Sequence, residues 1–182
     1  LSSKYSNIFI VTHNQNKGYG ASLISGFYRS KYNLIAFTDS DGQFDFSEIE
    51  KFIKVQKQTE ADLVVGYYLN RKVSFVRKIN SGLWQLLMRV LFNLKTKDID
   101  CGFKLLKKSV INKIPQLESQ RGAFISTELL VKANSCGFKI VEIPVHHYAR
   151  EKGSATGANL DVILNSFKDL FILRNNLKKY LK

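Results

Sequence analysis

The chain has few cysteines and prolines, and it lacks any long hydrophobic run. Its 182 residues include two cysteines, two prolines and one tryptophan. So few cysteines exclude a disulfide-rich scaffold, and two buried, reduced thiols are expected at Cys101 and Cys136. Because no stretch of about eighteen apolar residues occurs, the sequence predicts no membrane-spanning helix. No secretory signal is visible at its start, which points to the cytoplasm.

Acidic side chains are also scarce. The chain has 28 Lys/Arg against 15 Asp/Glu, which gives a formal net charge of +13. Residues 1–70 hold seven of each sign, whereas residues 71–182 hold 21 basic and eight acidic residues. A basic half of this kind suits an anionic partner, such as nucleotide phosphates, nucleic acid or an anionic membrane face.

Strand-like runs alternate with helix-like stretches, which predicts an α/β sandwich with a largely parallel sheet. The four runs are residues 8–12, 34–38, 62–66 and 139–145. Pro144 lacks an N–H group, so the last run is expected at an edge of the sheet or to end there. Gly137 is expected in the left-handed conformation that ends a helix.

Two helices carry recognisable signals. Ser47 and Glu50 predict a capping box at the start of one helix. A longer helix, from about residue 76 to 94, has apolar residues at helical spacing, interpreted as its core face. These residues are Ile79, Leu83, Leu86, Leu87, Val90, Leu91 and Leu94.

Residues 36–45, AFTDSDGQFD, concentrate carboxylates directly after an apolar run. Asp39 and Asp41 are two residues apart, so in extended backbone their side chains point the same way. In open α/β sheets, ligands bind beyond the carboxyl ends of strands. Paired hard oxygen atoms suit Mg²⁺ or Mn²⁺ bound to a diphosphate, with Gln43 adding a neutral oxygen and Gly42 allowing a close turn.

Two other interpretations compete with this metal–nucleotide site. One is a solvent-exposed acidic turn, because isolated Asp-x-Asp pairs are common. The other is a calcium loop, in which positions 1, 3, 5 and 12 are Asp39, Asp41, Gln43 and Glu50. The calcium template requires glycine at position 6 and a preceding helix, whereas Phe44 and a strand-like run are found here. The calcium loop is therefore excluded.

A glycine-rich loop, NQNKGYGASLISGFY at residues 14–28, lies between a strand-like run and a predicted helix. The N–H groups near Gly18 and the side chain of Lys17 form a candidate site for an anion such as phosphate. The loop is not a dinucleotide fingerprint, because Leu23 stands where the third glycine is needed, and it is not a P-loop. A tight turn that packs a helix on a sheet explains the same glycines equally well.

Five segments follow one another along the chain: NKGYGASLISGF, FTDSDGQFD, ADLVVGYYLNR, DIDCGFKLLKKSV and GFKIVEIPVHHYAREKGSATG. Together they resemble the family-two glycosyltransferases of GT-A fold, and most closely the branch of dolichyl-phosphate mannose synthases and polyprenyl-phosphate sugar transferases. The resemblance implies a Rossmann-like sandwich with a mostly parallel central sheet. It also implies inverting transfer of a sugar from a nucleoside-diphosphate-sugar donor, on Mg²⁺ or Mn²⁺, to a lipid-phosphate or glycan acceptor.

The resemblance assigns further roles by position. Asp98 takes an acidic position that orients the sugar or acts as a base, and Glu128 is a second candidate base. Arg150 and Ser154 match a segment that covers donor phosphates or receives the acceptor phosphate, and Arg77 matches a phosphate-facing basic position. A lipid-phosphate acceptor needs little deprotonation, so base catalysis is dispensable for it. The ordinary alternative for each acidic residue is a helix cap or a pair with a nearby lysine.

We expect the GT-A domain at residues 1–158, incomplete at its N-terminus because NIFIVTHNQNKGYG resembles the family's third strand. Residues 159–182 predict an amphipathic basic helix, which either lies on an anionic membrane surface or packs on its own sheet. His146 and His147 are expected to face opposite ways on a strand, which argues against a metal pair.

Two other functions compete with an active transferase. The net charge of +13 suggests a nucleic-acid-binding module, but the chain has no recognisable nucleic-acid-binding pattern. Such a module also leaves the acidic turn unexplained, so no nucleic-acid partner is expected. The second is a GT-A domain without catalytic activity that binds a partner.

Overall fold

The computed structural model of the chain describes residues 4–69, 75–120, 122–149 and 160–180. Strands alternate with helices along it, which confirms the α/β class. The elements are α1 (Tyr19–Arg29), β1 (Leu34–Phe37), the 3₁₀ helix η1 (Phe46–Glu48), α2 (Ile49–Thr59), β2 (Leu63–Tyr68), α3 (Phe75–Phe92), β3 (Lys104–Lys107), α4 (Lys108–Lys113), α5 (Phe124–Ser135), β4 (Ile140–Val145) and α6 (Leu160–Tyr180).

The strands of the described residues form one sheet in the order β1-β3-β2-β4. β2 and β4 pair in parallel, whereas β3 is antiparallel to both β1 and β2. β1, β2 and β4 therefore run in one direction, and β3 is the reversed strand. Lys104, the first residue of β3, lies opposite Phe37, the last residue of β1. β1, β2 and β4 therefore end, and β3 begins, along the same side of the sheet.

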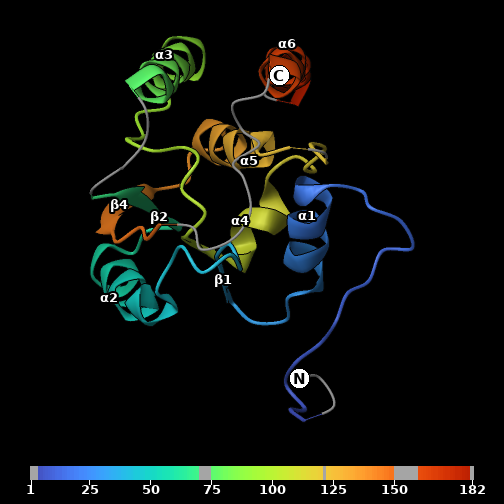
Figure 1. Cartoon of the computed structure of the whole chain (residues 1–182), viewed down its shortest axis with the longest axis vertical. Helices are drawn as coiled ribbons and strands as arrows, with labels where there is room; N and C mark the ends of the chain where they lie inside the picture. The colour runs from blue at the N-terminus through green and yellow to red at the C-terminus, as the bar shows by residue number, and fades with distance from the viewer. Residues whose placement is uncertain (1–3, 70–74, 121, 150–159, 181–182) are drawn as a thin grey trace.

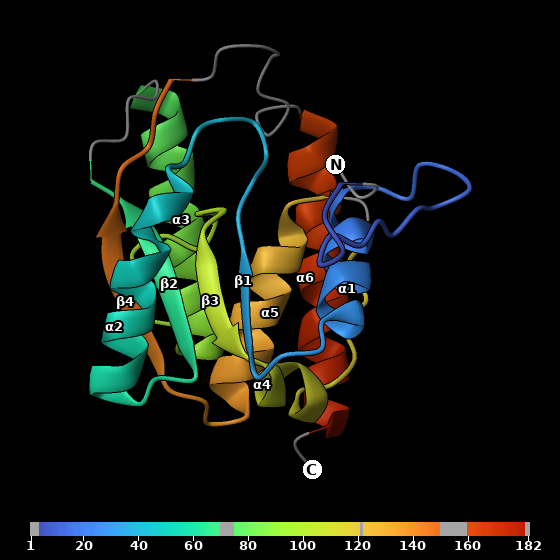
Figure 2. The same ribbon diagram turned by 90° about the horizontal axis from the view of Figure 1, so that it is seen from below.

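Helices cover both faces of this sheet. α2 lies on one face, and α1, α4 and α5 lie on the other, with α3 and α6 outside α5 (Figures 1 and 2). The alternation of side chains along β2 explains the two layers, because Leu63 and Val65 join the core with α5 while Val64 joins Phe52 of α2. α5 is the central helix, and its residues 124–133 are all buried.

The ends of several elements test the sequence predictions. The capping box is wrong: the carboxylate of Asp45 accepts a hydrogen bond from the N–H of Ser47 at 2.9 Å, and η1 precedes α2. Gly137 has a φ of 78°, which confirms the left-handed residue after α5. β4, which contains Pro144, lies at an edge of the described sheet, as predicted.

The run at residues 8–12 does not form the predicted strand. Its apolar side chains are exposed by 39 to 69 per cent: Ile8, Phe9, Ile10 and Val11. Figure 2 shows the segment beside α1, on the side away from the sheet. A strand needs a neighbour for its backbone N–H and C=O groups, and no strand of the described sheet pairs with this run.

The apolar stripe predicted as the core face of α3 is buried only in part. Ile79, Leu83, Leu86 and Val90 are 46, 60, 55 and 72 per cent exposed. Leu87, Leu91 and Leu94 of the predicted stripe lie in the core or pack against it, together with Trp84 and Met88. Because α3 is apolar on two sides, its helical spacing alone cannot identify the buried one.

α6 packs against α5 and still exposes aromatic side chains. Leu170, Leu173 and Leu177 are buried in the same core as α5, whereas Phe167 and Phe171 are 42 and 64 per cent exposed. Within the described residues, no helix combines the length and apolar character needed to cross a membrane. The division of the chain at residue 158 stays a prediction.

The two cysteines differ in exposure. Cys101 is buried as predicted, and burial raises the pKa of its thiol to about 12. Cys136 is exposed, which corrects the expectation of two buried thiols; it follows the last turn of α5, where the chain reaches the surface. Both are free thiols.

Candidate active site

The candidate site lies where β1, β2 and β4 end and β3 begins. Three segments meet there, namely the acidic turn after β1 (residues 38–45), the loop before β3 (residues 97–103) and the segment after β4 (residues 146–149). Gly102 lies against the carboxylate of Asp39, and Tyr148 is hydrogen-bonded to Gln43. The carboxyl-end edge predicted from the sequence is therefore where distant parts of the chain converge.

Asp39 is contacted from two sides. The hydroxyl of Tyr19, the first residue of α1, donates a hydrogen bond to Asp39 Oδ1 at 2.9 Å. On the other side, a Cβ atom added at Gly102 would overlap Oδ2 and lie 2.7 Å from Cγ. Burial raises the pKa of Tyr19, and the carboxylates of Asp39 and Asp41 raise it further, so both carboxylates act on this hydroxyl.

Asp41 and Gln43 shape the acidic turn. Asp41 Oδ1 accepts a hydrogen bond from the N–H of Gln43 at 3.2 Å, and Gly42 between them has a φ of 77°. The side-chain amide of Gln43 donates to the carbonyl oxygen of Tyr148 at 3.1 Å, and the N–H of Tyr148 donates to the carbonyl oxygen of Gln43 at 2.9 Å. Gln43 thus joins the turn to the segment after β4, and its role as a metal ligand stays a prediction.

Asp98 is placed by a carboxylate on β4. Glu142 Oε1 accepts hydrogen bonds from the N–H groups of Lys97, at 2.6 Å, and of Asp98, at 3.4 Å. Asp98 is only 5 per cent exposed, and its Oδ1 accepts from the N–H of Asp100 at 3.1 Å. Glu142 was not predicted as a site residue, although it belongs to the quoted Glu-Ile-Pro-Val segment.

Lys104 places a buried amine against the same loop. Its side chain is fully buried and donates hydrogen bonds to the carbonyl oxygen atoms of Ile99, at 3.2 Å, and of Cys101, and to Ser126 Oγ at 3.4 Å. Burial lowers the pKa of Lys104, and nearby acidic groups oppose this effect: Cys101, Asp100, Asp98 and Asp39. The sequence pattern contained Lys104 but gave it no role.

Glu128, the second candidate base, has a structural task. Its carboxylate is 2 per cent exposed and forms an ion pair with Lys132 at 2.6 Å. It also accepts hydrogen bonds from the N–H groups of Glu118 and Ser119 at 2.8 to 3.1 Å. A carboxylate held in this way anchors the loop before α5, and its role as a base stays a prediction.

The glycine-rich loop differs from the predicted anion site. The N–H of Gly18 donates to the side chain of Asn16 at 2.9 Å, and the N–H of Ala21 donates to the carbonyl oxygen of Gln120 at 2.9 Å. Internal partners therefore occupy N–H groups that the prediction assigned to phosphate. Lys17 is exposed, and its contact with phosphate stays a prediction.

Three predicted phosphate-binding residues cannot be placed. Arg150 and Ser154 lie outside the described residues, and so does the side chain of Arg77, although its backbone belongs to α3. The segment that leads to Arg150 is described as far as Ala149, and it is fixed to the acidic turn at Tyr148.

The donor set of the acidic turn fits a hard divalent cation. In the part of the chain that the structure describes, no cluster of three or more His, Cys, Asp or Glu side chains could hold a metal ion. The closed ligand set of a structural zinc site is therefore absent from those residues. Mg²⁺ is commonly bound by one or two carboxylates plus water and substrate phosphates, which matches Asp39 and Asp41.

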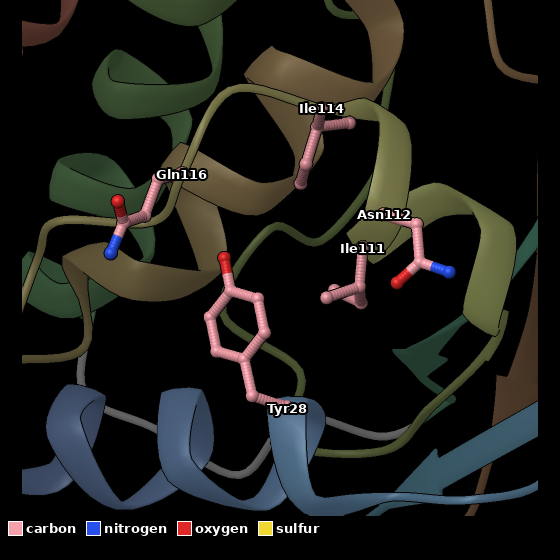
Figure 3. A pocket seen from close by; sticks show the side chains of 5 residues that line it. All are labelled: Tyr28, Ile111, Asn112, Ile114 and Gln116. Atoms are coloured by element: carbon pink, nitrogen blue, oxygen red, sulfur yellow. The ribbon is translucent and has the colours of Figure 1, made fainter.

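A large open cavity lies away from this site. It has a volume of about 570 Å³ and lies between α1 and α4, where Tyr28 faces Ile111, Ile114 and Gln116 (Figure 3). The residues that line this cavity include no carboxylate, so the cavity does not offer a metal site.

The sequence of the chain matches a known family. Residues 1–115 match the family described as Glycosyl transferase family 2. The chain belongs to this family. Among curated relatives, it is 30 per cent identical over 169 residues to dodecaprenyl-phosphate galacturonate synthase from Rhizobium johnstonii, over 91 per cent of this chain and 49 per cent of the relative.

Further similarities agree with this assignment. The chain is 31 per cent identical over 190 residues to dolichyl-phosphate beta-glucosyltransferase from Saccharomyces cerevisiae, over 93 per cent of this chain and 55 per cent of the relative. It thus spans about half the length of these two relatives.

A solved structure shows the fold. Glucosyl-3-phosphoglycerate synthase from Mycobacterium tuberculosis, in complex with Mn²⁺, uridine diphosphate and glucosyl-3-phosphoglycerate, superposes with a TM-score of 0.62. The match has 14 per cent identity and covers 88 per cent of this chain and 55 per cent of that one. The fold is the GT-A sandwich predicted from the sequence.

Proposed function

We propose that the chain is the catalytic domain of a metal-dependent, inverting glycosyltransferase. It transfers a sugar from a nucleoside-diphosphate-sugar to a polyprenyl phosphate. The observation that carries this proposal is the convergence of Asp39, Gly102 and Tyr148 at one edge of the sheet. The named relatives support the choice of donor and acceptor, since they are a dodecaprenyl-phosphate galacturonate synthase and a dolichyl-phosphate glucosyltransferase.

Asp39 and Asp41 hold the cation in this proposal. A bound Mg²⁺ or Mn²⁺ supplies Lewis-acid stabilisation of the charge that grows on the departing nucleoside diphosphate. Asp98 orients the donor sugar, or accepts a proton where the acceptor is a hydroxyl group. Lys17, Arg77, Arg150 and Ser154 contact donor or acceptor phosphates, because cationic and hydroxyl side chains bind phosphate oxygens well.

A transfer assay tests the proposal. The chain is incubated with Mn²⁺, a series of nucleoside-diphosphate-sugars and a short polyprenyl phosphate, and the lipid-linked sugar is measured. We expect Asp39→Asn and Asp41→Asn to abolish both transfer and metal-dependent nucleotide binding. Glu50→Gln, which neutralises an exposed carboxylate on α2, serves as the control and should retain both. Full transfer without a divalent cation would contradict the proposal.

The acceptor proposed above is a membrane lipid, and we propose that α3 and α6 dock on a membrane surface. The exposed apolar residues of α3, including Leu83 and Val90, and the exposed Phe167 and Phe171 of α6 support this proposal. Figure 1 shows α3 and α6 on the same side of the molecule, outside α5. A groove of about 200 Å³ is lined by residues of both helices and includes Arg174. Apolar side chains beside cations are the features of an interfacial surface.

Sedimentation with vesicles tests this docking. We expect the chain to bind vesicles that contain phosphatidylserine, and to be released as the salt concentration rises. Leu83→Ser combined with Phe171→Ser should weaken binding, because both side chains are exposed and their loss leaves the core intact. Tyr32→Ser, which alters an 83 per cent exposed aromatic residue after α1, is the control. Equal binding by all three proteins would exclude this surface.

A further inference from the structure

Tyr19 connects the glycine-rich loop to the acidic turn. It is the first residue of α1, and its hydroxyl donates a hydrogen bond to Asp39 Oδ1 at 2.9 Å. The side chain is 38 per cent exposed, so its hydroxyl lies at the margin of the site. Neither the glycine spacing nor the acidic pattern of the sequence assigned Tyr19 a role.

The opposite side of Asp39 is closed by backbone. Gly102 lies so close to the carboxylate that a Cβ atom there would overlap Oδ2 and lie 3.1 Å from Oδ1. Only glycine leaves room for Asp39 in this arrangement. The carboxylate is therefore restrained on one side by a hydrogen bond and on the other by steric contact.

The start of α1 is itself firmly held. A Cβ atom at Gly20 would overlap the carbonyl oxygen of Ser119, and the N–H of Ala21 donates to the carbonyl oxygen of Gln120 at 2.9 Å. The loop that contains Ser119 is anchored in turn by Glu128 of the central helix. The backbone of Tyr19 is thus fixed through close packing to the core, which lets its side chain define a position for Asp39.

We infer that Tyr19 and Gly102 form a two-sided holder that fixes the orientation of the Asp39 carboxylate for a divalent cation, with Tyr19 as a positioning residue. This inference rests on the proposed metal site. The terminal torsion of an aspartate is broad, so an unrestrained carboxylate must be ordered when the metal binds. A carboxylate has about four lone-pair sites, and the Tyr19 hydroxyl uses one of them, which favours one orientation of the carboxylate.

The hydroxyl remains a donor under neutral conditions. A tyrosine hydroxyl ordinarily loses its proton only well above neutral pH, so it can donate to Asp39. Outer partners that orient a ligating carboxylate typically change metal affinity by about 10–100-fold when they are removed. Because Tyr19 is partly exposed, we expect an effect of about tenfold.

Mn²⁺ binding to Tyr19→Phe tests the inference. Free Mn²⁺ is measured by electron paramagnetic resonance while the chain is titrated with Mn²⁺ alone, and again with uridine diphosphate present. We expect the Kd for Mn²⁺ to rise about tenfold in Tyr19→Phe. Its unfolding midpoint without metal should match that of Tyr28→Phe, which removes a hydroxyl from the same helix and should bind Mn²⁺ like the wild type. In transfer, kcat/KM should fall at limiting Mn²⁺ and recover at saturating Mn²⁺.

The outcomes separate the inference from the proposed function. If the wild type binds Mn²⁺ and Asp39→Asn does not, but Tyr19→Phe binds as tightly as the wild type or more tightly, the positioning role is overturned and the metal site stands. If the wild type does not bind Mn²⁺ with or without the nucleotide, both are overturned. Gly102→Ala gives a second measurement of the holder, with Gly26→Ala as control, because a Cβ atom at Gly26 has no heavy atom within 4 Å. A Gly102→Ala chain that folds and keeps wild-type Mn²⁺ affinity would also count against the holder.

Discussion

Replacing Lys132 by methionine should destabilise the chain strongly, because the change leaves the carboxylate of Glu128 buried without its counter-charge. The two side chains are 0 and 2 per cent exposed and lie 2.6 Å apart. Removing one member of such a pair typically costs about 3–5 kcal/mol. Hydrogen bonds from the N–H groups of Glu118 and Ser119 remain on the carboxylate, so we expect the lower end, about 3 kcal/mol.

Thermal and urea unfolding measure this effect. For a chain of this length, a change of about 1 kcal/mol shifts Tm by roughly 2–4 °C, so Tm should fall by about 6–12 °C. Lys57→Met, which removes an exposed lysine from α2, controls for the loss of one positive charge and should change Tm little. A Lys132→Met protein as stable as this control would refute the structural role of the pair.

Substitution of Glu128 itself distinguishes a structural role of this residue from a catalytic one. Glu128→Gln should lower Tm and leave kcat of the folded protein unchanged, since the carboxylate is occupied by Lys132 and by backbone N–H groups. A catalytic base would give the reverse pattern, with an intact Tm and a large loss of kcat.

Three further predictions concern stability. Gly26→Ala should stabilise the chain by about 0.5–1 kcal/mol, because Gly26 lies within α1 and its Cβ would meet open space. Gly66→Ala should destabilise it by about 1–3 kcal/mol, since a Cβ there would lie 2.9 Å from Cys101 Sγ and 3.0 Å from the carbonyl oxygen of Phe103. Glu48 is largely buried, which raises its pKa, but hydrogen bonds from Lys51 and His146 lower it below the ordinary value of 4.5. Since a lowered carboxyl pKa stabilises the folded state above the unfolded value, Glu48→Gln should be less stable than the wild type at pH 7. Urea titrations should show this difference shrinking as the pH falls below 4.5.

Local patterns predicted much of the fold. Apolar runs located β1, β2 and β4, and Gly137 marked the residue after α5 in the left-handed conformation. β3 was not predicted, because KLLK has a lysine at each end and too few residues to show alternation. The buried side of α3 was predicted only in part, since the choice between its two apolar sides depends on α5 and α6, which lie elsewhere in the sequence.

The candidate site was predicted where one segment carries the whole signal. Asp39 and Asp41 follow β1 directly, so the pattern of charge after an apolar run located them. Tyr19, Gly102 and Glu142 act on that turn or on Asp98 from other elements, and their roles depend on tertiary contacts. Glu128 shows the reverse case, in which an acidic residue at a family position is engaged by the core.

Lys104 fixes the loop that lies against the acidic turn. Lys104 is fully buried, which lowers the pKa of its amine, and the nearby Cys101, Asp100, Asp98 and Asp39 oppose this effect. Its three hydrogen bonds go to Ile99, Cys101 and Ser126, so it fixes the loop beneath Asp39 through neutral oxygen atoms. The loop fixed in this way carries Gly102, whose backbone closes one side of the Asp39 carboxylate.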